Sequence, residues 1–161
     1  MRSRFAPLLA ALLLSTPAFA PALAHDYKAG AVRIGHPFSR ATPPGARVGA
    51  GYMTLENGGT VADRLVSASS PRAGAVEVHS SDMTDGVMRM RRVEGGLAIP
   101  AGATVTLAPG GGLHLMLMNL AEPLRAGERV PLELRFEHGG TVQTELAVEA
   151  MGGGADPHAG H

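Results

Sequence analysis

Histidine and methionine recur in the second half of the chain at spacings that can bind a soft metal ion. His79 is followed after ten residues by Met90, and 23 further residues lead to His114-Leu115-Met116. Thioether sulfur is a soft, uncharged donor and imidazole is borderline, so together they suit Cu(I) far better than Zn(II), Mg(II) or Ca(II). These four side chains are therefore candidate ligands for a cuprous ion.

The absence of cysteine narrows the chemistry further. The 161 residues include no cysteine, so the chain cannot supply the thiolate that a blue-copper electron carrier requires. Zinc would normally recruit cysteine, histidine or carboxylate rather than thioether. No nucleophile with an adjacent base and orienting group is apparent, and thioethers favour Cu(I) too strongly for a copper oxidase cycle. We therefore predict no enzymatic activity.

Packing is the competing interpretation of the same residues. Methionine is a flexible core filler, and methionines at a spacing of two are usually packing residues. We expect Met88, which shares a face with Met90, to pack beside the metal and exclude water rather than to bind the ion. The residues interpreted as core, structural or solvated are Met53, Met83, Met118, His36 and His138. Two alternatives stay open on the residues alone, namely a metal-free β-sandwich interaction module and a periplasmic copper storage or resistance protein.

The elements that must position the candidate ligands are strands. Residues 113–120 alternate leucine with other residues, so Leu115 and Leu117 point to one face while His114 and Met116 point to the other. Residues 75–81 are expected to pair with 87–96 through a polar turn at 82–86, which would bring His79 and Met90 together across a hairpin.

The remaining pattern predicts an all-β domain. Apart from the first 24 residues, no segment has a helical period, and a loop is expected at 41–49. Eight or nine antiparallel strands at a spacing of roughly ten residues are typical of a sandwich or Greek-key barrel. The further strands are expected at 31–41, 49–57, 64–70 and 104–112, with a hairpin at 129–150 around His138-Gly139-Gly140.

Residues 1–24 have the pattern of a cleaved secretory signal peptide. Arg2 and Arg4 precede a short apolar run at 8–14, and Ala22-Leu23-Ala24 fits cleavage before His25. The product would be a domain at 25–150 with a flexible tail at 151–161, located in the periplasm. Removing two of 14 basic residues leaves 12 against 14 acidic ones, a net charge of −2, which favours neither nucleic acid nor an anionic membrane as a partner. We expect no membrane anchoring after cleavage.

The two ends of the mature chain carry a second set of candidate ligands. His158 and His161 lie in the glycine-rich tail after Met151, and cleavage would free the amine and imidazole of His25. Imidazole and amine are harder donors that suit Cu(II). One hypothesis is a second, weaker Cu(II) site, and the alternative is a solvated tail.

At these residues the sequence resembles the periplasmic copper chaperone family PCu(A)C. The pattern of that family is a histidine, ten residues, a methionine, roughly twenty more residues and then His-x-Met. The second gap is slightly longer in this chain, and the turn PGGG at 109–112 can accommodate the difference. The resemblance covers residues 27–150 and includes IGHPFSRATPPGA (34–46), GAGYMTLEN (49–57) and DGVMRMRRVEGGLAIPAG (85–102).

The resemblance implies a cupredoxin-like Greek-key β-barrel and a specific site. By this likeness His79, Met90, His114 and Met116 would be the Cu(I) ligands. The family delivers copper toward the copper centres of cytochrome c oxidase, often with thioredoxin-like Sco proteins. The expected partners are therefore the copper-bearing subunit of the oxidase, Sco-type proteins, or both. Arg89, Arg91 and Arg92 either form a basic rim for an acidic partner or are a solvated face.

Overall fold

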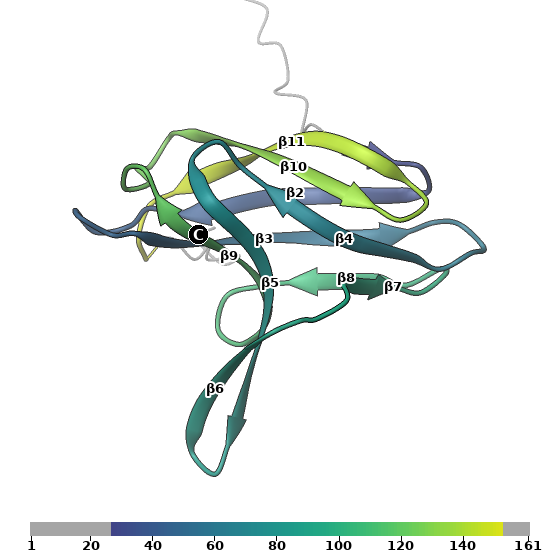
Figure 1. Ribbon diagram of the computed structural model, residues 1–161, viewed down its shortest axis with the longest axis horizontal. Helices are drawn as coiled ribbons and strands as arrows, with labels where there is room; N and C mark the ends of the chain where they lie inside the picture. Colours follow the sequence, from purple (N-terminus) through teal and green to yellow (C-terminus); the bar gives the residue numbers. More distant parts are fainter. Residues whose placement is uncertain (1–26, 153–161) are drawn as a thin grey trace, which may run out of the picture.

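Alternation of apolar and polar residues through the chain produces eleven strands and no helix in the computed structural model, which describes residues 27–152 (Figure 1). The signal peptide predicted at 1–24, together with His25, His158 and His161, lies outside these residues. Within 27–152 no helix is long and apolar enough to cross a lipid bilayer. The strands are β1 (Tyr27–Ala29), β2 (Val32–Arg40), β3 (Val48–Asn57), β4 (Asp63–Ser69), β5 (Ala73–Thr84), β6 (Val87–Arg92), β7 (Leu97–Ile99), β8 (Thr104–Leu107), β9 (Gly112–Leu120), β10 (Arg129–Phe136) and β11 (Gly140–Glu149).

Seven of these strands close into a barrel. The order is β2-β11-β10-β4-β5-β9-β3, and β3 pairs back onto β2. All of these pairings are antiparallel except that between β11 and β2, which is parallel. The pairing between β4 and β5 consists of one residue pair, Ala68 with Val76. The barrel is therefore closed, with its weakest seam between β4 and β5.

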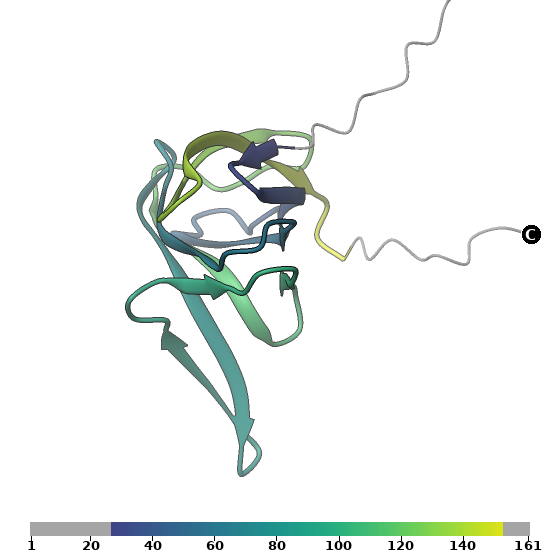
Figure 2. The same cartoon turned by 90° about the vertical axis from the view of Figure 1, so that its right-hand side faces the viewer.

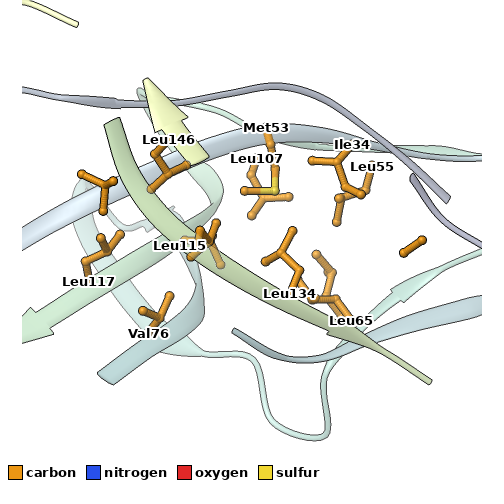
Figure 3. Packing of buried hydrophobic residues seen from close by; sticks show 14 of the residues in the cluster. Ile34, Met53, Leu55, Leu65, Val76, Leu107, Leu115, Leu117, Leu134 and Leu146 are labelled. Carbon is orange, nitrogen blue, oxygen red and sulfur yellow. The ribbon is translucent and has the colours of Figure 1, made fainter. Parts of the chain in front are cut away.

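The inward faces of the strands form one hydrophobic core. Leu115 and Leu117 of β9 are fully buried, and Val76 of β5 lies opposite Leu117. Figure 3 shows these residues converging with Met53 and Leu146 from other strands. Since leucine alternates with histidine or methionine from Leu113 to Met118 of β9, the leucines that anchor this strand in the core turn His114 and Met116 to its outer face.

The hairpin of β5 and β6 projects from the barrel, as Figures 1 and 2 both show. The first part of β5 pairs with β9, and its end, from His79 to Thr84, pairs with β6. Asp85 and Gly86 have φ angles of 53° and 75°, as a two-residue type I′ turn requires. Every residue of β6 is exposed, so β5 is the element that ties the hairpin to the barrel.

The structure confirms the all-β barrel and corrects several details. There are eleven strands rather than eight or nine, because β1 and β7 have three residues each and are too short to show an alternating pattern. The turn predicted at 82–86 is also too long. The type I′ turn needs only two residues with positive φ, so Asp82, Met83 and Thr84 continue the strand as paired residues.

Candidate metal centre

The outer faces of β5, β6 and β9 meet at the base of the projecting hairpin. His79 of β5 lies directly opposite His114 of β9, and Glu77 lies opposite Met116. On the other side of β5, Met90 of β6 lies opposite Ser81, two residue pairs along from the pair of His79 and Arg92. Side chains two positions apart in a strand point to the same face. The four predicted ligands are thus on one continuous surface outside the leucine core.

A pocket of about 270 Å³ opens on this surface. Three of the predicted ligands, Met90, His114 and Met116, line it together with Met88. His79 does not line this pocket and adjoins it through its pairing with His114. The other lining residues are Ala50, Tyr52, Ser81 and the loop Ala108, Pro109, Gly110 and Gly111.

His114 presents an unpartnered nitrogen in this setting. The residue is only 7% exposed. Its Nδ1 lies 3.4 Å from the carbonyl oxygen of Gly112, a long hydrogen bond, whereas its buried Nε2 has no hydrogen-bond partner. Buried polar atoms are almost always hydrogen-bonded, so an exception calls for an explanation such as a ligand.

His79 is oriented by a carboxylate. Its Nε2 lies 2.9 Å from the Oε2 atom of Glu77, and a carboxylate can only accept, so Nε2 carries the proton and donates. In the neutral imidazole this leaves the lone pair on Nδ1, which is buried and has no partner. Metal-binding histidines commonly donate their other nitrogen to a carboxylate in this way. Arg92 Nη1 lies 3.1 Å from Glu77 Oε1 and holds the carboxylate in turn.

The two imidazole rings are close enough to share one ion. Their centroids are 6.0 Å apart and their planes are inclined by 52°. A metal–imidazole bond is about 2 Å long, which places two rings on one ion at centroid separations of up to roughly 6 Å. The unpartnered nitrogens of His79 and His114 lie on the same outer surface as Met90 and Met116, and imidazole with thioether is a combination of donors that Cu(I) prefers.

Glu77 is one of two residues near the site that sequence reasoning missed. The available signal was its position two residues before His79, because a strand places such residues on one face. Tyr52 was missed as well, since it reaches the pocket from β3, and no local pattern connects β3 to the ligand strands.

The other histidines and methionines considered in the sequence lie in the core, at the surface or outside the pocket. Met53 is 2% exposed and belongs to the core, as expected. His36 is at the surface, where its ring contacts Phe38 at a centroid distance of 4.9 Å, and His138 is exposed. Met118 shares the outer face of β9 but does not line the pocket. Met151 is 61% exposed, and the histidines proposed to act with it lie outside the described residues.

The arginines near the site are largely engaged with acidic residues of the same chain. Arg91 pairs with Asp82 at 2.9 Å, and Arg92 pairs with Glu77 and, at 3.8 Å, with Glu94. These contacts neutralise much of the basic rim that the sequence suggested.

Within residues 27–152, no group of three or more histidine or carboxylate side chains gathers in a position to hold an ion.

Comparison with known proteins decides the family. The profile of the family described as "LpqE-like: Putative lipoprotein LpqE-like" matches residues 32–148. The chain belongs to the LpqE-like family. A curated relative, "Putative lipoprotein Lxx21020" of Leifsonia xyli subsp. xyli, is 34% identical over 116 residues, which are 72% of this chain and 69% of the relative.

Solved structures similar to this LpqE-like chain are PCuAC domains and a related protein. The copper-bound PCuAC domain of PmoF2 has a TM-score of 0.67 and 31% identity, covering 78% of this chain and 98% of its own. The solution structure of CuI-DR1885 from Deinococcus radiodurans has a TM-score of 0.56 and 34% identity, covering 83% and 86% of the two chains. The resemblance to PCu(A)C and the cupredoxin-like fold are thereby confirmed.

Proposed function

We propose that this protein is a copper carrier that binds one Cu(I) ion through His79, Met90, His114 and Met116. The observation that carries the proposal is the pair of buried imidazole nitrogens without partners, on facing strands beside a methionine-lined pocket. Two of the similar structures are described as copper-bound or as containing CuI, which supports the same cargo. Cu(I) bound by two imidazoles and two thioethers keeps its single positive charge, because all four donors are neutral.

The position of the site suits delivery more than storage. Met90 is 47% exposed on the projecting hairpin, whereas His114 is buried at the barrel wall. An acceptor can therefore displace the Met90 thioether first and reach the imidazoles later. Transfer proceeds by stepwise ligand exchange, and the exposed, weakly bound thioether makes the first exchange fast.

We further propose that delivery takes place in the periplasm after cleavage of residues 1–24. The acceptors are the copper-bearing subunit of cytochrome c oxidase, Sco-type thioredoxin-like proteins, or both. The signal pattern of the sequence supports export, and the description of the relatives as lipoproteins agrees with an envelope location. Mass determination of the mature protein tests the cleavage, with His25 expected as its first residue.

Anaerobic titration with Cu(I) against a competing chelator tests the binding site. The wild-type protein should bind one ion tightly, and the double variant His114→Ala/Met116→Ala should lose at least about 100-fold in affinity, since it lacks half of the donors. The matched control is His138→Ala/Met151→Ala, which removes an exposed histidine and an exposed methionine away from the pocket.

The outcomes separate the proposal from its alternatives. Equal Cu(I) binding by wild type and His114→Ala/Met116→Ala would overturn the assigned site. Tight binding of several ions would favour a storage or resistance protein. Absence of Cu(I) binding by the wild type would favour the metal-free interaction module.

A further inference from the structure

The projecting hairpin carries methionines that the four-ligand site does not use. Met83 of β5 is 67% exposed and Met88 of β6 is 58% exposed. They lie directly opposite each other, next to the pair that flanks the type I′ turn. Exposed methionines on a strand that is also exposed do not pack in the core, so the usual explanation for methionine pairs does not apply to them.

The hydrogen-bond register of the hairpin brings these two side chains close together. The backbone N–H of Val93 donates to the carbonyl of Val78 at 2.9 Å, so these two residues face each other at a hydrogen-bonded position. Antiparallel pairs alternate between hydrogen-bonded and non-hydrogen-bonded positions. Counting along the register, the pair of Met83 and Met88 is non-hydrogen-bonded. Cα atoms in such pairs are only about 4.5 Å apart, and their side chains are closer together than those of hydrogen-bonded pairs.

The same face leads from the hairpin tip to the proposed Cu(I) site. Met83 and Met88 form one pair, Ser81 and Met90 the next along this face, and His79 follows. Met88 belongs to both regions, because it also lines the pocket with Met90, His114 and Met116. Met83, Met88 and Met90 therefore form a row on one face of the hairpin, from its exposed tip toward His79 and His114.

We propose that Met83 and Met88 form a second, weaker Cu(I) site that passes the ion to and from the four-ligand site. Two neutral thioethers on a close cross-strand pair can bind a soft monovalent ion, and they discriminate against harder cations. Because this site has no imidazole, it binds Cu(I) less tightly than the four-ligand site does. Met88 lies between Met83 and Met90, so it shortens the distance over which the ion must move to reach Met90. This inference rests on the proposed Cu(I) function and extends it to the route of the ion.

Anaerobic NMR of protein carrying ¹³C-labelled methionine methyl groups tests the second site. During addition of Cu(I) alone, the first equivalent should shift the methyl resonances of Met90 and Met116. Further Cu(I) should then shift that of Met83, which does not line the pocket, in a saturable way, with at least about tenfold weaker affinity because two thioethers act without imidazole. The methyl of Met53, which is buried in the core, is the internal control.

A variant separates the second site from the first. Met83→Leu, which leaves every residue that lines the pocket in place, should keep the first equivalent, lose the second binding phase, and load from a Cu(I)–chelator complex at least about threefold more slowly than wild type. Met118→Leu, at a residue outside the pocket lining, should load at the wild-type rate. A methyl shift of Met83 no larger than that of Met53, or an unchanged loading rate of Met83→Leu, would overturn this inference while leaving the four-ligand site in place. Unshifted methyls of Met90 and Met116 would instead overturn the proposed function.

Discussion

Two buried polar regions of this barrel differ in how their polar atoms are satisfied. Asp63 is 8% exposed, and its carboxylate accepts hydrogen bonds from the backbone N–H groups of Arg64, His138 and Gly139 at 2.7, 3.0 and 2.9 Å. At the outer face of β5 and β9, by contrast, His79 Nδ1 and His114 Nε2 have no partner. The first region is complete within the chain, and the second is complete only with a ligand.

This difference distinguishes a structural site from the proposed metal site. A buried polar atom that loses its partner costs about 1–3 kcal/mol, so an apolar residue in place of either histidine would relieve that cost. The Asp63 carboxylate stabilises the turn between β10 and β11 by joining it to the start of β4. In the proposed function, the histidines instead keep nitrogen lone pairs free for a metal ion. Substitutions in one region should therefore change stability or Cu(I) binding without changing the other property in parallel.

The largest expected effect on stability is that of Asp63→Ala. This change leaves three backbone N–H groups without their acceptor, and we expect a loss of about 3 kcal/mol in the free energy of unfolding. Thermal unfolding should show a Tm lower by roughly 10 °C. The Cu(I) affinity of the folded variant should equal that of wild type, and a parallel loss of affinity would contradict the separation of the two regions.

The same carboxylate should make stability depend on pH. Burial raises the pKa of Asp63, but the hydrogen bonds from the backbone of His138, Arg64 and Gly139 outweigh it and hold the pKa below its ordinary value of 3.8. Because the folded-state pKa is lowered, the stabilisation is fully present above the ordinary pKa and is lost as the pH falls through the folded-state value.

Comparison with Asp63→Asn isolates this contribution. The amide cannot ionise, so wild type should exceed Asp63→Asn in Tm at neutral pH, and this difference should narrow between about pH 5 and about pH 2. Thermal unfolding of both proteins across this range measures the difference. A gap that stays constant down to the lowest pH would contradict the role assigned to the Asp63 charge.

At the proposed metal centre, removing the Glu77 carboxylate should weaken binding without removing a ligand. Glu77→Ala frees the His79 imidazole to rotate and to change tautomer, and such changes typically cost about 10–100-fold in metal affinity. Glu77→Gln should have a smaller effect, since its amide oxygen can still accept from Nε2. Competition titration with Cu(I) measures both.

Glu94→Ala is the matched control for Glu77. Glu94 pairs with the same Arg92 but is largely exposed, and no contact joins it to His79 in the described residues. We expect wild-type affinity for this variant. If Glu77→Ala also bound Cu(I) as tightly as wild type, the orienting role of the carboxylate would be wrong.

The smallest expected effect is that of His114→Leu on the stability of the metal-free protein. The substitution removes a buried nitrogen that has no partner, so the free energy of unfolding should stay the same or rise by about 1 kcal/mol. Urea unfolding of the metal-free variant measures it. A clear loss of stability would mean that His114 is a structural residue.

The sequence predicted which face the candidate ligands occupy, because the period of a strand determines the face on which each residue lies. Leu115 and Leu117 identified the buried face of β9, and this assignment placed His114 and Met116 outside it. The position of Met90 relative to His79 followed from the same reasoning on the hairpin. The longer second gap leaves this face unchanged, because the glycines at 110–112, which have positive φ, come before His114. Gly110 and Gly111 lie in the turn that precedes β9, and Gly112 is the first residue of that strand.

Other features depend on contacts that no local pattern contains. The direct pairing of His79 with His114 joins strands 35 positions apart in the chain, so it requires the order of strands in the sheet. The parallel pairing of β11 with β2 requires the same information. The role of Glu77 became visible only with the His79 Nε2 distance, because a lone glutamate on a strand is ordinarily a solvated residue.

X-ray absorption at the copper edge of the anaerobically loaded protein tests the central claim most directly. The account predicts Cu(I) with both nitrogen and sulfur scatterers, and a reduced sulfur contribution in Met90→Leu/Met116→Leu. Copper surrounded by nitrogen and oxygen alone, or a sulfur contribution that this double variant leaves unchanged, would contradict it.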